Sequence, residues 1–303
     1  MTYRFLIVDG YDLDGRAKLD SAGCTPASEL YERMVLEALP GCEILSLHAA
    51  DADARLPAGL DLTAFDALLW TGSSLTIYDN VPEVTRQIDL ARAAFAAGVP
   101  SFGSCWALQI ATVAAGGSCR LNPNGREFGI TRNKVRLTLE GASHPLYKGK
   151  PPAFDAFTSH FDDVESLPSH SVVLATNEAT QVQAAVITCS GTSFWAVQYH
   201  PEYDFREIAA LARLRAEGLL AEGRFDSRQD LDRWVTDLDS LHEDPERLGP
   251  RWRLGISRDL VDVAIRRLEF RNWADSVLSG RQRPAPKRTA TKCGGAAELE
   301  NIL

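Results

Sequence analysis

The sequence predicts an α/β fold in which helices cover both faces of a mainly parallel sheet, followed by a helical extension at the C-terminal end. Up to about residue 115, short apolar runs alternate with segments that have helical spacing, which is typical of strand–helix–strand units. From residue 127 to 197 several β-rich runs follow one another, so a mixed or antiparallel part is expected. After Pro201, apolar residues at three- and four-residue spacing predict helices.

Local signals place the elements of the parallel part. The run RFLIVD at 4–9 is apolar and partly β-branched and turns at Gly10, as a buried strand does. The segment 82–97 has Pro82 in its first turn and Gly98 after its end, and these residues favour the start and the end of a helix. By the same reasoning the sequence predicts strands at 43–47, 66–70 and 99–102, and helices at 28–39 and 106–115.

The strands and helices predicted after residue 127 show less regular spacing of apolar residues. Together with the earlier elements they suggest how the chain is divided into domains. Strands are expected at 130–139, 155–158, 172–175, 182–188 and 193–198, and helices at 204–221, 227–242 and 256–279. We divide the chain into an α/β domain at 1–223, a helical appendage at 224–280 without a Gly-rich phosphate loop, and a tail at 281–303. The basic residues, prolines and Gly-Gly pair of the tail predict disorder.

Composition limits the classes of function. The 303 residues carry a formal net charge of −9, which disfavours nonspecific nucleic-acid binding because that needs a basic face. There is no uncharged apolar stretch of about 18 residues, and the N-terminal residues run into a strand without the pattern of a signal peptide. We therefore expect a cytoplasmic protein with no membrane span. The six cysteines form no CxxC pair, which argues against a zinc ribbon and a disulfide scaffold.

A cysteine stands in the segment VPSFGSCWALQ, between a predicted strand and a predicted helix. Gly103 and Ser104 are small enough for a tight strand-to-helix turn, the thiol counterpart of the nucleophile elbow of serine hydrolases. At a helix start the dipole favours the thiolate of Cys105, and the N–H of Trp106 would supply one oxyanion-hole donor. These residues alone leave open the alternative that Cys105 is a buried structural thiol.

A nucleophilic thiolate needs a base, and His200 is the strongest candidate. It follows the apolar run FWAVQY, which places it at a strand end, where functional groups gather in open parallel sheets. Glu202 would hold the far ring nitrogen and complete a Cys-His-Glu triad. The turn at Gly72 and Ser73 is the expected source of the second oxyanion donor, since glycine lets the backbone approach a substrate carbonyl.

Five motifs occur in the order TGSSLTIYD, GSCWALQ, GREFG, SHFDDVESLP and QYHPEYD. From about Phe5 to Tyr203 they resemble the class I, or triad, glutamine amidotransferases, above all stand-alone members similar to the glutaminase domain of GMP synthase and to γ-glutamyl peptidases. The resemblance implies a flavodoxin-like sheet and needs no cofactor and no metal. It also implies a reaction in which Cys105 attacks the side-chain amide of glutamine, His200 transfers the proton, ammonia leaves, and water hydrolyses a γ-glutamyl thioester.

The resemblance implies roles for residues around the triad. Ser73 and Trp106 fall where the family supplies its oxyanion-hole amides. The positions implied to bind substrate are Gly72, Gln109, Ser159, His160 and Phe161, and the last three align with the segment that holds the α-amino and carboxylate groups. The oxyanion loop reads Gly-Ser-Ser instead of Gly-Gly-Pro, and the elbow reads Cys-Trp-Ala-Leu-Gln instead of Cys-x-Gly-His-Gln. These departures put the shape of the pocket and the substrate in doubt.

Several alternatives stay open. The substrate is free glutamine, with ammonia passed to a separate synthase, or it is a γ-glutamyl peptide or amide. A noncatalytic regulatory binding protein on the same fold is the alternative from another class. For Arg126 and Glu127 a surface ion pair is favoured over contact with substrate. Tyr78 and Asp79 are expected to fix the oxyanion loop through hydrogen bonds.

Overall fold

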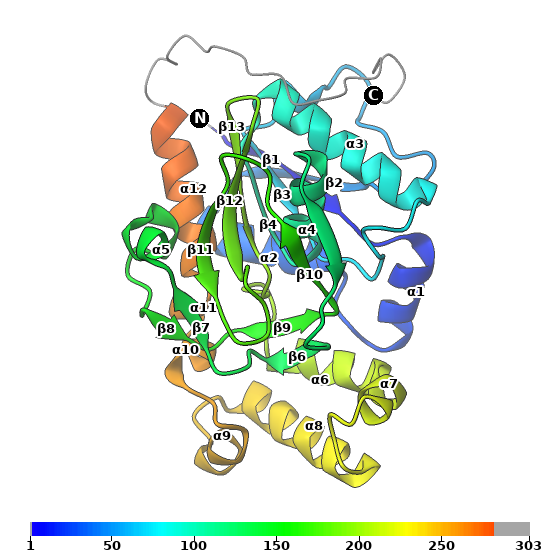
Figure 1. Ribbon diagram of the computed structural model, residues 1–303, viewed down its shortest axis with the longest axis vertical. Helices are drawn as coiled ribbons and strands as arrows, with labels where there is room; N and C mark the ends of the chain where they lie inside the picture. Colours follow the sequence, from blue (N-terminus) through cyan, green and yellow to red (C-terminus); the bar gives the residue numbers. More distant parts are fainter. Residues whose placement is uncertain (1, 282–303) are drawn as a thin grey trace.

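A nine-stranded sheet forms the centre of the protein in the computed structural model, which describes residues 2–281 (Figure 1). Its order is β2-β1-β3-β4-β13-β12-β11-β7-β8. The parallel half consists of β2 (Glu43–His48), β1 (Arg4–Asp9), β3 (Ala67–Trp70), β4 (Ser101–Ser104) and β13 (Thr192–Val197). The antiparallel half consists of β12 (Ala184–Cys189), β11 (Val172–Thr176), β7 (Val135–Leu137) and β8 (Ala153–Phe154). The predicted α/β class with a mainly parallel sheet is confirmed.

Helices cover both faces of the sheet because successive strand residues point to opposite sides. On one face, Leu6 and Val8 pack in a core with α3 (Pro82–Ala97) and α4 (Trp106–Ala114). On the other, Phe5 and Ile7 pack with α2 (Ala27–Ala38) and α12 (Leu268–Arg281). The rings of Phe102 and Trp273 lie 5.4 Å apart between centroids, so α12 belongs to the core of the sheet.

Several further elements lie toward the end of the sheet at which the parallel strands end. Two short antiparallel pairs lie there, β5 (Ser118–Leu121) with β10 (Asp162–Ser166), and β6 (Glu127–Ile130) with β9 (Phe157–His160). A third core joins α1 (Leu13–Ser21), α6 (Phe205–Leu214), α7 (Ala216–Ala221) and α8 (Arg228–Glu243). The chain continues through α9 (Leu248–Leu254), α10 (Arg258–Val261) and α11 (Val263–Arg266) to α12 (Figure 1). Within residues 2–281, every helix is too short or too polar to cross a membrane.

The structure departs from the predicted elements at particular residues. The strand expected at 130–139 is interrupted because Asn133 and Lys134 turn with φ values of 54° and 59°, and α5 (Leu139–Ser143) begins where that strand was expected to end. The helix expected at 204–221 breaks at Arg215, between α6 and α7. The Asp- and Gly-rich segment after β1, expected as a loop, contains α1, whose first turn is capped by Asp12.

The proposed division between 1–223 and 224–280 stays a prediction. Residues on its C-terminal side fall into two of the three cores, since α8 packs with α6 and α12 packs on the sheet. Of the tail predicted at 281–303, all but the first residue lies outside the described residues.

Candidate active site

Cys105 lies in the turn between β4 and α4 and has the backbone geometry of a nucleophile elbow. Its φ of 54° and ψ of −101° are unfavourable for a residue with a Cβ. Its N–H donates to the carbonyl of Val197 at 2.7 Å, which ties the turn to β13. A Cβ on Gly103 would lie 2.3 Å from the Cβ of Ala107. The elbow therefore accommodates Ala107 only because residue 103 is glycine.

His200 and Glu202 follow β13 and are both buried. The Nδ1 atom of His200 is hydrogen-bonded to Oε1 of Glu202 at 2.7 Å, and the ring stacks on Tyr203 at 3.9 Å between centroids. Burial lowers the pKa of His200, but the charges of Glu202 and Cys105 and the hydrogen bond to Glu202 outweigh this effect and raise the pKa to about 9. The geometry thus favours an imidazolium ring held in one orientation.

Gly72, which follows the end of β3, lies close to Cys105 and His200. A Cβ on Gly72 would lie 3.1 Å from Cε1 of His200 and 3.9 Å from the Cβ of Cys105. The Sγ atom of Cys105 donates to the carbonyl of Ser159 at 3.7 Å, and the buried Nε2 atom of His200 has no partner by distance and angle among residues 2–281. That nitrogen is free to exchange a proton with a group that arrives between sulfur and ring.

The side chains around the oxyanion loop converge on one carbonyl, that of Gly10. It accepts from Oγ of Ser73 at 2.8 Å and from Nε2 of Gln87 at 3.1 Å. The indole of Trp106 donates to Oε1 of Gln87 at 2.8 Å, so Trp106 is linked to the same carbonyl through Gln87. Trp106 is the first residue of α4, where a backbone N–H has no acceptor within the helix.

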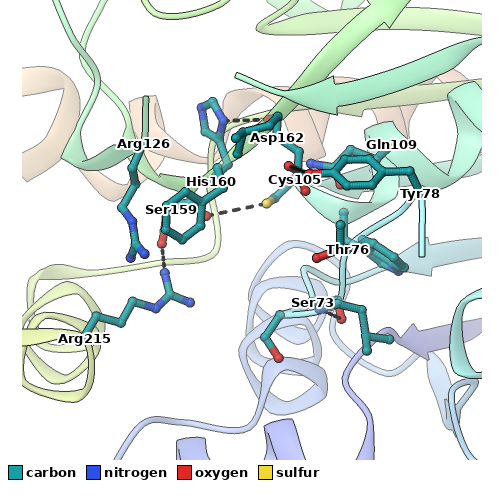
Figure 2. Close-up of a pocket in the computed structure, with 15 residues that line it drawn as sticks. Ser73, Thr76, Tyr78, Cys105, Gln109, Arg126, Ser159, His160, Asp162 and Arg215 are labelled. Carbon is teal, nitrogen blue, oxygen red and sulfur yellow. Dashed lines mark hydrogen bonds between the residues drawn. The ribbon is translucent and has the colours of Figure 1, made fainter. Parts of the chain in front are cut away.

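A cavity of about 430 Å³ opens beside Cys105 (Figure 2). Of the residues expected at the site, those that line it are Ser73, Cys105, Trp106, Gln109, Ser159, His160 and Phe161. Gly72, His200 and Glu202 are not among the residues that line it. In Figure 2, Arg126 and Arg215 lie to the left of Cys105, and Tyr78 lies to its right.

Comparison with known proteins assigns this arrangement to a family. The model of the family "Glutamine amidotransferase class-I" matches residues 51–211. A gamma-glutamyl-L-1-hydroxyisopropylamide hydrolase from Pseudomonas sp. is 32% identical over 279 residues, which are 91% of this chain and 93% of the relative. The chain belongs to the class I glutamine amidotransferases. It is an enzyme of the glutamine amidotransferase type, a family that typically hydrolyses amides through a thioester.

Further relatives match either over a smaller part of their own length or at a lower sequence identity. The amidotransferase is 29% identical to the GMP synthase of Citrobacter koseri over 180 residues, but this covers 58% of the chain and 31% of that synthase. Glutamine amidotransferase structures from Methylobacillus flagellatus and Thermotoga maritima superpose with TM-scores of 0.62 and 0.60, at 18% and 16% identity. They cover 95% and 92% of this chain and 99% of their own, and at this identity they establish the fold.

The interpretation of Arg126 and Glu127 as a surface ion pair is wrong for this amidotransferase. Glu127 is 1% exposed. Its carboxylate accepts from the backbone N–H of Arg132 and from the side-chain amides of Asn177 and Gln183, and it bonds the Nε2 atom of His160 at 3.0 Å. Burial opposes its ionisation, but these hydrogen bonds hold the pKa of Glu127 below its usual range. His160 is thereby fixed with its ring turned toward Glu127.

Arg126 instead pairs with Glu222 at 3.1 Å and lies over the ring of Phe161, 3.5 Å from its centroid. Burial lowers the pKa of Arg126 to about 10, Glu222 opposes this, and the positive charge of Arg215 adds to it. Two guanidinium groups therefore lie close together at the cavity wall.

Sequence reasoning missed Arg215 and misjudged Tyr78. Arg215 stands at the break between α6 and α7 and donates to the hydroxyl of Ser159. Its signal in the sequence was small, since one arginine in a helical run gives no sign that the run breaks there. Tyr78 does not bond the oxyanion loop, because its hydroxyl donates to Oδ1 of Asp162 at 3.0 Å. The N–H of Asp79 bonds Thr76 within the same turn.

Proposed function

We propose that this amidotransferase hydrolyses γ-glutamyl amides of small amines, with Cys105 as nucleophile, His200 as general acid and base, and Glu202 as the group that orients His200. The observation that carries the proposal is that the strained Cys105 turn, which lines the cavity, lies beside the buried His200–Glu202 pair. The 32% identity to a γ-glutamyl amide hydrolase along nearly the whole chain gives further support.

In the first half of the reaction, Sγ of Cys105 forms a bond to the γ-carbonyl carbon, and the oxyanion lies between the N–H groups of Ser73 and Trp106. The C–N bond breaks as Nε2 of His200 gives its proton to the departing amine. In the second half, water adds to the thioester carbon while His200 accepts a proton. The C–S bond then breaks, and glutamate and the thiolate are released.

The glutamyl part is assigned to the wall formed by Ser159, Arg126 and Arg215. The carbonyl of Ser159 accepts a hydrogen bond from Sγ of Cys105, and the hydroxyl of Ser159 accepts one from the guanidinium of Arg215. Ser159 thus lies between Sγ of Cys105 and the guanidinium of Arg215. A γ-glutamyl group likewise has a short chain between its amide carbon and its α-carboxylate. Guanidinium groups bind carboxylates through charge-assisted hydrogen bonds, so this wall suits the α-carboxylate better than a neutral group.

Free glutamine with a separate synthase as ammonia acceptor is the second candidate. It is favoured by the GMP synthase match, which leaves the larger part of each synthase without a counterpart here. A cytoplasmic location is a further part of the proposal. We rank direct hydrolysis first, because the relative matched along 93% of its length is named as a hydrolase.

The test measures release of amine or ammonia from glutamine and from a γ-glutamyl alkylamide. We expect the alkylamide to be hydrolysed, and Cys105→Ala to lose more than about 10³-fold of kcat because triad members act as a unit. The matched control is Cys42→Ala, a half-buried cysteine outside the site, which should keep wild-type rates. Retained hydrolysis in Cys105→Ala, or a folded wild type inert toward every γ-glutamyl compound, contradicts the proposal.

A further inference from the structure

A second cavity, of about 510 Å³, lies where β6 meets α8 and the turn after α7 (Figure 1). Two arginines line it, Arg132 from the turn after β6 and Arg224 from the turn after α7. Cys105, His200 and Glu202 do not line it, so this cavity is separate from the catalytic one. Its volume is in the range of pockets that bind small molecules.

The two guanidinium groups of this cavity have no counter-ion. Among residues 2–281 the side chain of Arg132 makes no ion pair or hydrogen bond, and the guanidinium of Arg224 bonds only the carbonyl of Arg126. The nearby carboxylates are engaged elsewhere, since Glu222 pairs with Arg126 and Glu127 is held by the hydrogen bonds described above. Burial lowers the pKa of Arg224, the charge of Arg132 lowers it further, and Glu222 and Glu127 offset part of this. Two like charges without a counter-ion at one cavity favour the binding of an anion.

Aromatic side chains line the same cavity. The indole of Trp234 lies against the backbone of Gly129, where a Cβ would be 2.8 Å from its Cζ2 atom. Phe225 meets this indole edge-on at 5.5 Å between ring centroids, and the ring of Phe128 lies 6.2 Å from it. These three rings line the cavity, and flat rings held in place bind other rings by stacking or edge contacts. The cavity thus combines a charged part and an aromatic part.

We propose that this second cavity is an effector site for a small organic anion that carries a carboxylate or a phosphate on an aromatic ring. Arg132 and Arg224 hold the anionic group through charge-assisted hydrogen bonds, and Trp234 and Phe225 hold the ring. The effect of this ligand on activity rests on the proposed function, whereas its binding does not.

Strand β6 connects the second cavity to the catalytic one. Arg126 lines the catalytic cavity, and its carbonyl accepts from Arg224 of the second cavity. Glu127 lines the second cavity and bonds His160, which lines the catalytic one. A negative charge beside Arg224 therefore acts on the wall to which we assign the α-carboxylate of the substrate. It weakens the attraction for that carboxylate, so the effector raises KM and leaves kcat unchanged.

Titration calorimetry with the full chain and three probes tests the binding. The probe 2-naphthoate carries ring and charge, 2-naphthalenemethanol lacks the charge, and acetate lacks the ring. We expect 2-naphthoate to bind at least about ten-fold more tightly than either of the others. A fourth titration, with 2-naphthyl phosphate, shows which of the two anionic groups binds more tightly.

The kinetic test measures hydrolysis of a γ-glutamyl alkylamide at increasing concentrations of 2-naphthoate. We expect KM to rise to a plateau of about five-fold at constant kcat. A ligand that competes for the catalytic cavity would instead raise KM without limit, so a rise with no plateau overturns the effector site.

Two variants and two controls test the residues. Arg132→Gln should weaken the binding of 2-naphthoate at least about ten-fold, and Trp234→Leu should weaken it as well if the first variant folds poorly. Arg233→Gln is the matched control, because Arg233 is an exposed arginine beside Trp234 on α8 that does not line the cavity. Arg215→Gln alters the catalytic cavity alone. Both controls should keep the wild-type affinity for 2-naphthoate.

Several outcomes contradict the proposal. Equal affinity for 2-naphthoate, 2-naphthalenemethanol and acetate overturns the site, and so does binding that is lost in Arg215→Gln but kept in Arg132→Gln. Binding that leaves KM unchanged overturns the effector role. If the folded enzyme binds 2-naphthoate but hydrolyses no γ-glutamyl compound, the ligand site stands, and the proposed function is overturned together with the effector role.

Discussion

The hydroxyl of Ser104 donates to Oε1 of Glu202 at 2.8 Å, the same oxygen that bonds His200 at 2.7 Å. Ser104 precedes Cys105, so one residue of the elbow holds the carboxylate of Glu202. The hydroxyl of Tyr31 donates to Ser104 at 2.8 Å and completes a buried chain. The position of Glu202 is therefore set from β4 and α2 as well as from its own turn.

Replacing Ser104 by alanine should loosen Glu202 and leave the buried Tyr31 hydroxyl without its acceptor. We expect the free energy of unfolding to fall by about 1–3 kcal/mol and kcat/KM to fall about ten-fold, measured by urea unfolding and by amine release. Ser101→Ala is the control, because Ser101 is on the same strand as Ser104 but accepts its hydrogen bond from the indole of Trp70 on β3, away from Glu202. Equal activity losses in the two variants would show that Ser104 acts through folding alone.

Replacing Glu202 by glutamine should shift the pH dependence of activity. With a His200 pKa of about 9, the imidazolium needed by the leaving amine is present at neutral pH and is lost as the pH rises through about 9. Glutamine removes the charge that raises this pKa, so the alkaline limb of kcat/KM should move to lower pH, and kcat should fall about 10²- to 10⁴-fold. An alkaline limb at the wild-type position in Glu202→Gln contradicts this role.

The same pKa predicts how folding stability depends on pH. His200 has a folded-state pKa of about 9, above the ordinary value of 6.5, so protonation favours the folded state. This contribution is complete below about pH 6.5 and is lost as the pH rises toward about 9. Urea unfolding at a series of pH values should show the loss in the wild type, and His200→Gln should flatten it.

Much of this site could be predicted from the sequence because its groups stand at strand ends, where short apolar runs mark the positions of Cys105, His200 and Gly72. The burial of Glu127 could not, since its partners His160, Asn177 and Gln183 lie 33, 50 and 56 residues away. Arg215 was missed for a similar reason. Its contact with Ser159 spans 56 residues and depends on a helix break that periodicity does not mark.

The buried pair of Lys150 and Glu269 fastens α12 to the rest of the protein. The ammonium and a carboxylate oxygen are 2.9 Å apart, with both side chains at most 2% exposed, and Tyr199 donates to the same carboxylate at 2.6 Å. Replacing Glu269 by leucine leaves the Lys150 charge buried without a counter-ion, so we expect a loss of about 3–5 kcal/mol in urea unfolding. The exposed pair of Arg228 and Asp232 is the control, and Asp232→Ala should cost less than about 1 kcal/mol.

The side chains of Ser73 and Trp106 are both linked to the carbonyl of Gly10. Ser73 bonds that carbonyl directly, and Trp106 reaches it through Gln87, so both residues of the expected oxyanion hole also fix the loop behind it. Trp106→Phe keeps the backbone N–H and most of the packing, but leaves the buried Oε1 of Gln87 without its donor. We expect kcat to fall about ten-fold with little change in KM, because a displaced oxyanion loop weakens contacts made only in the transition state. Trp195→Phe, which changes an indole on β13 that packs against His144, should leave kcat unchanged. A rise in KM at constant kcat in Trp106→Phe would instead place the indole in substrate binding.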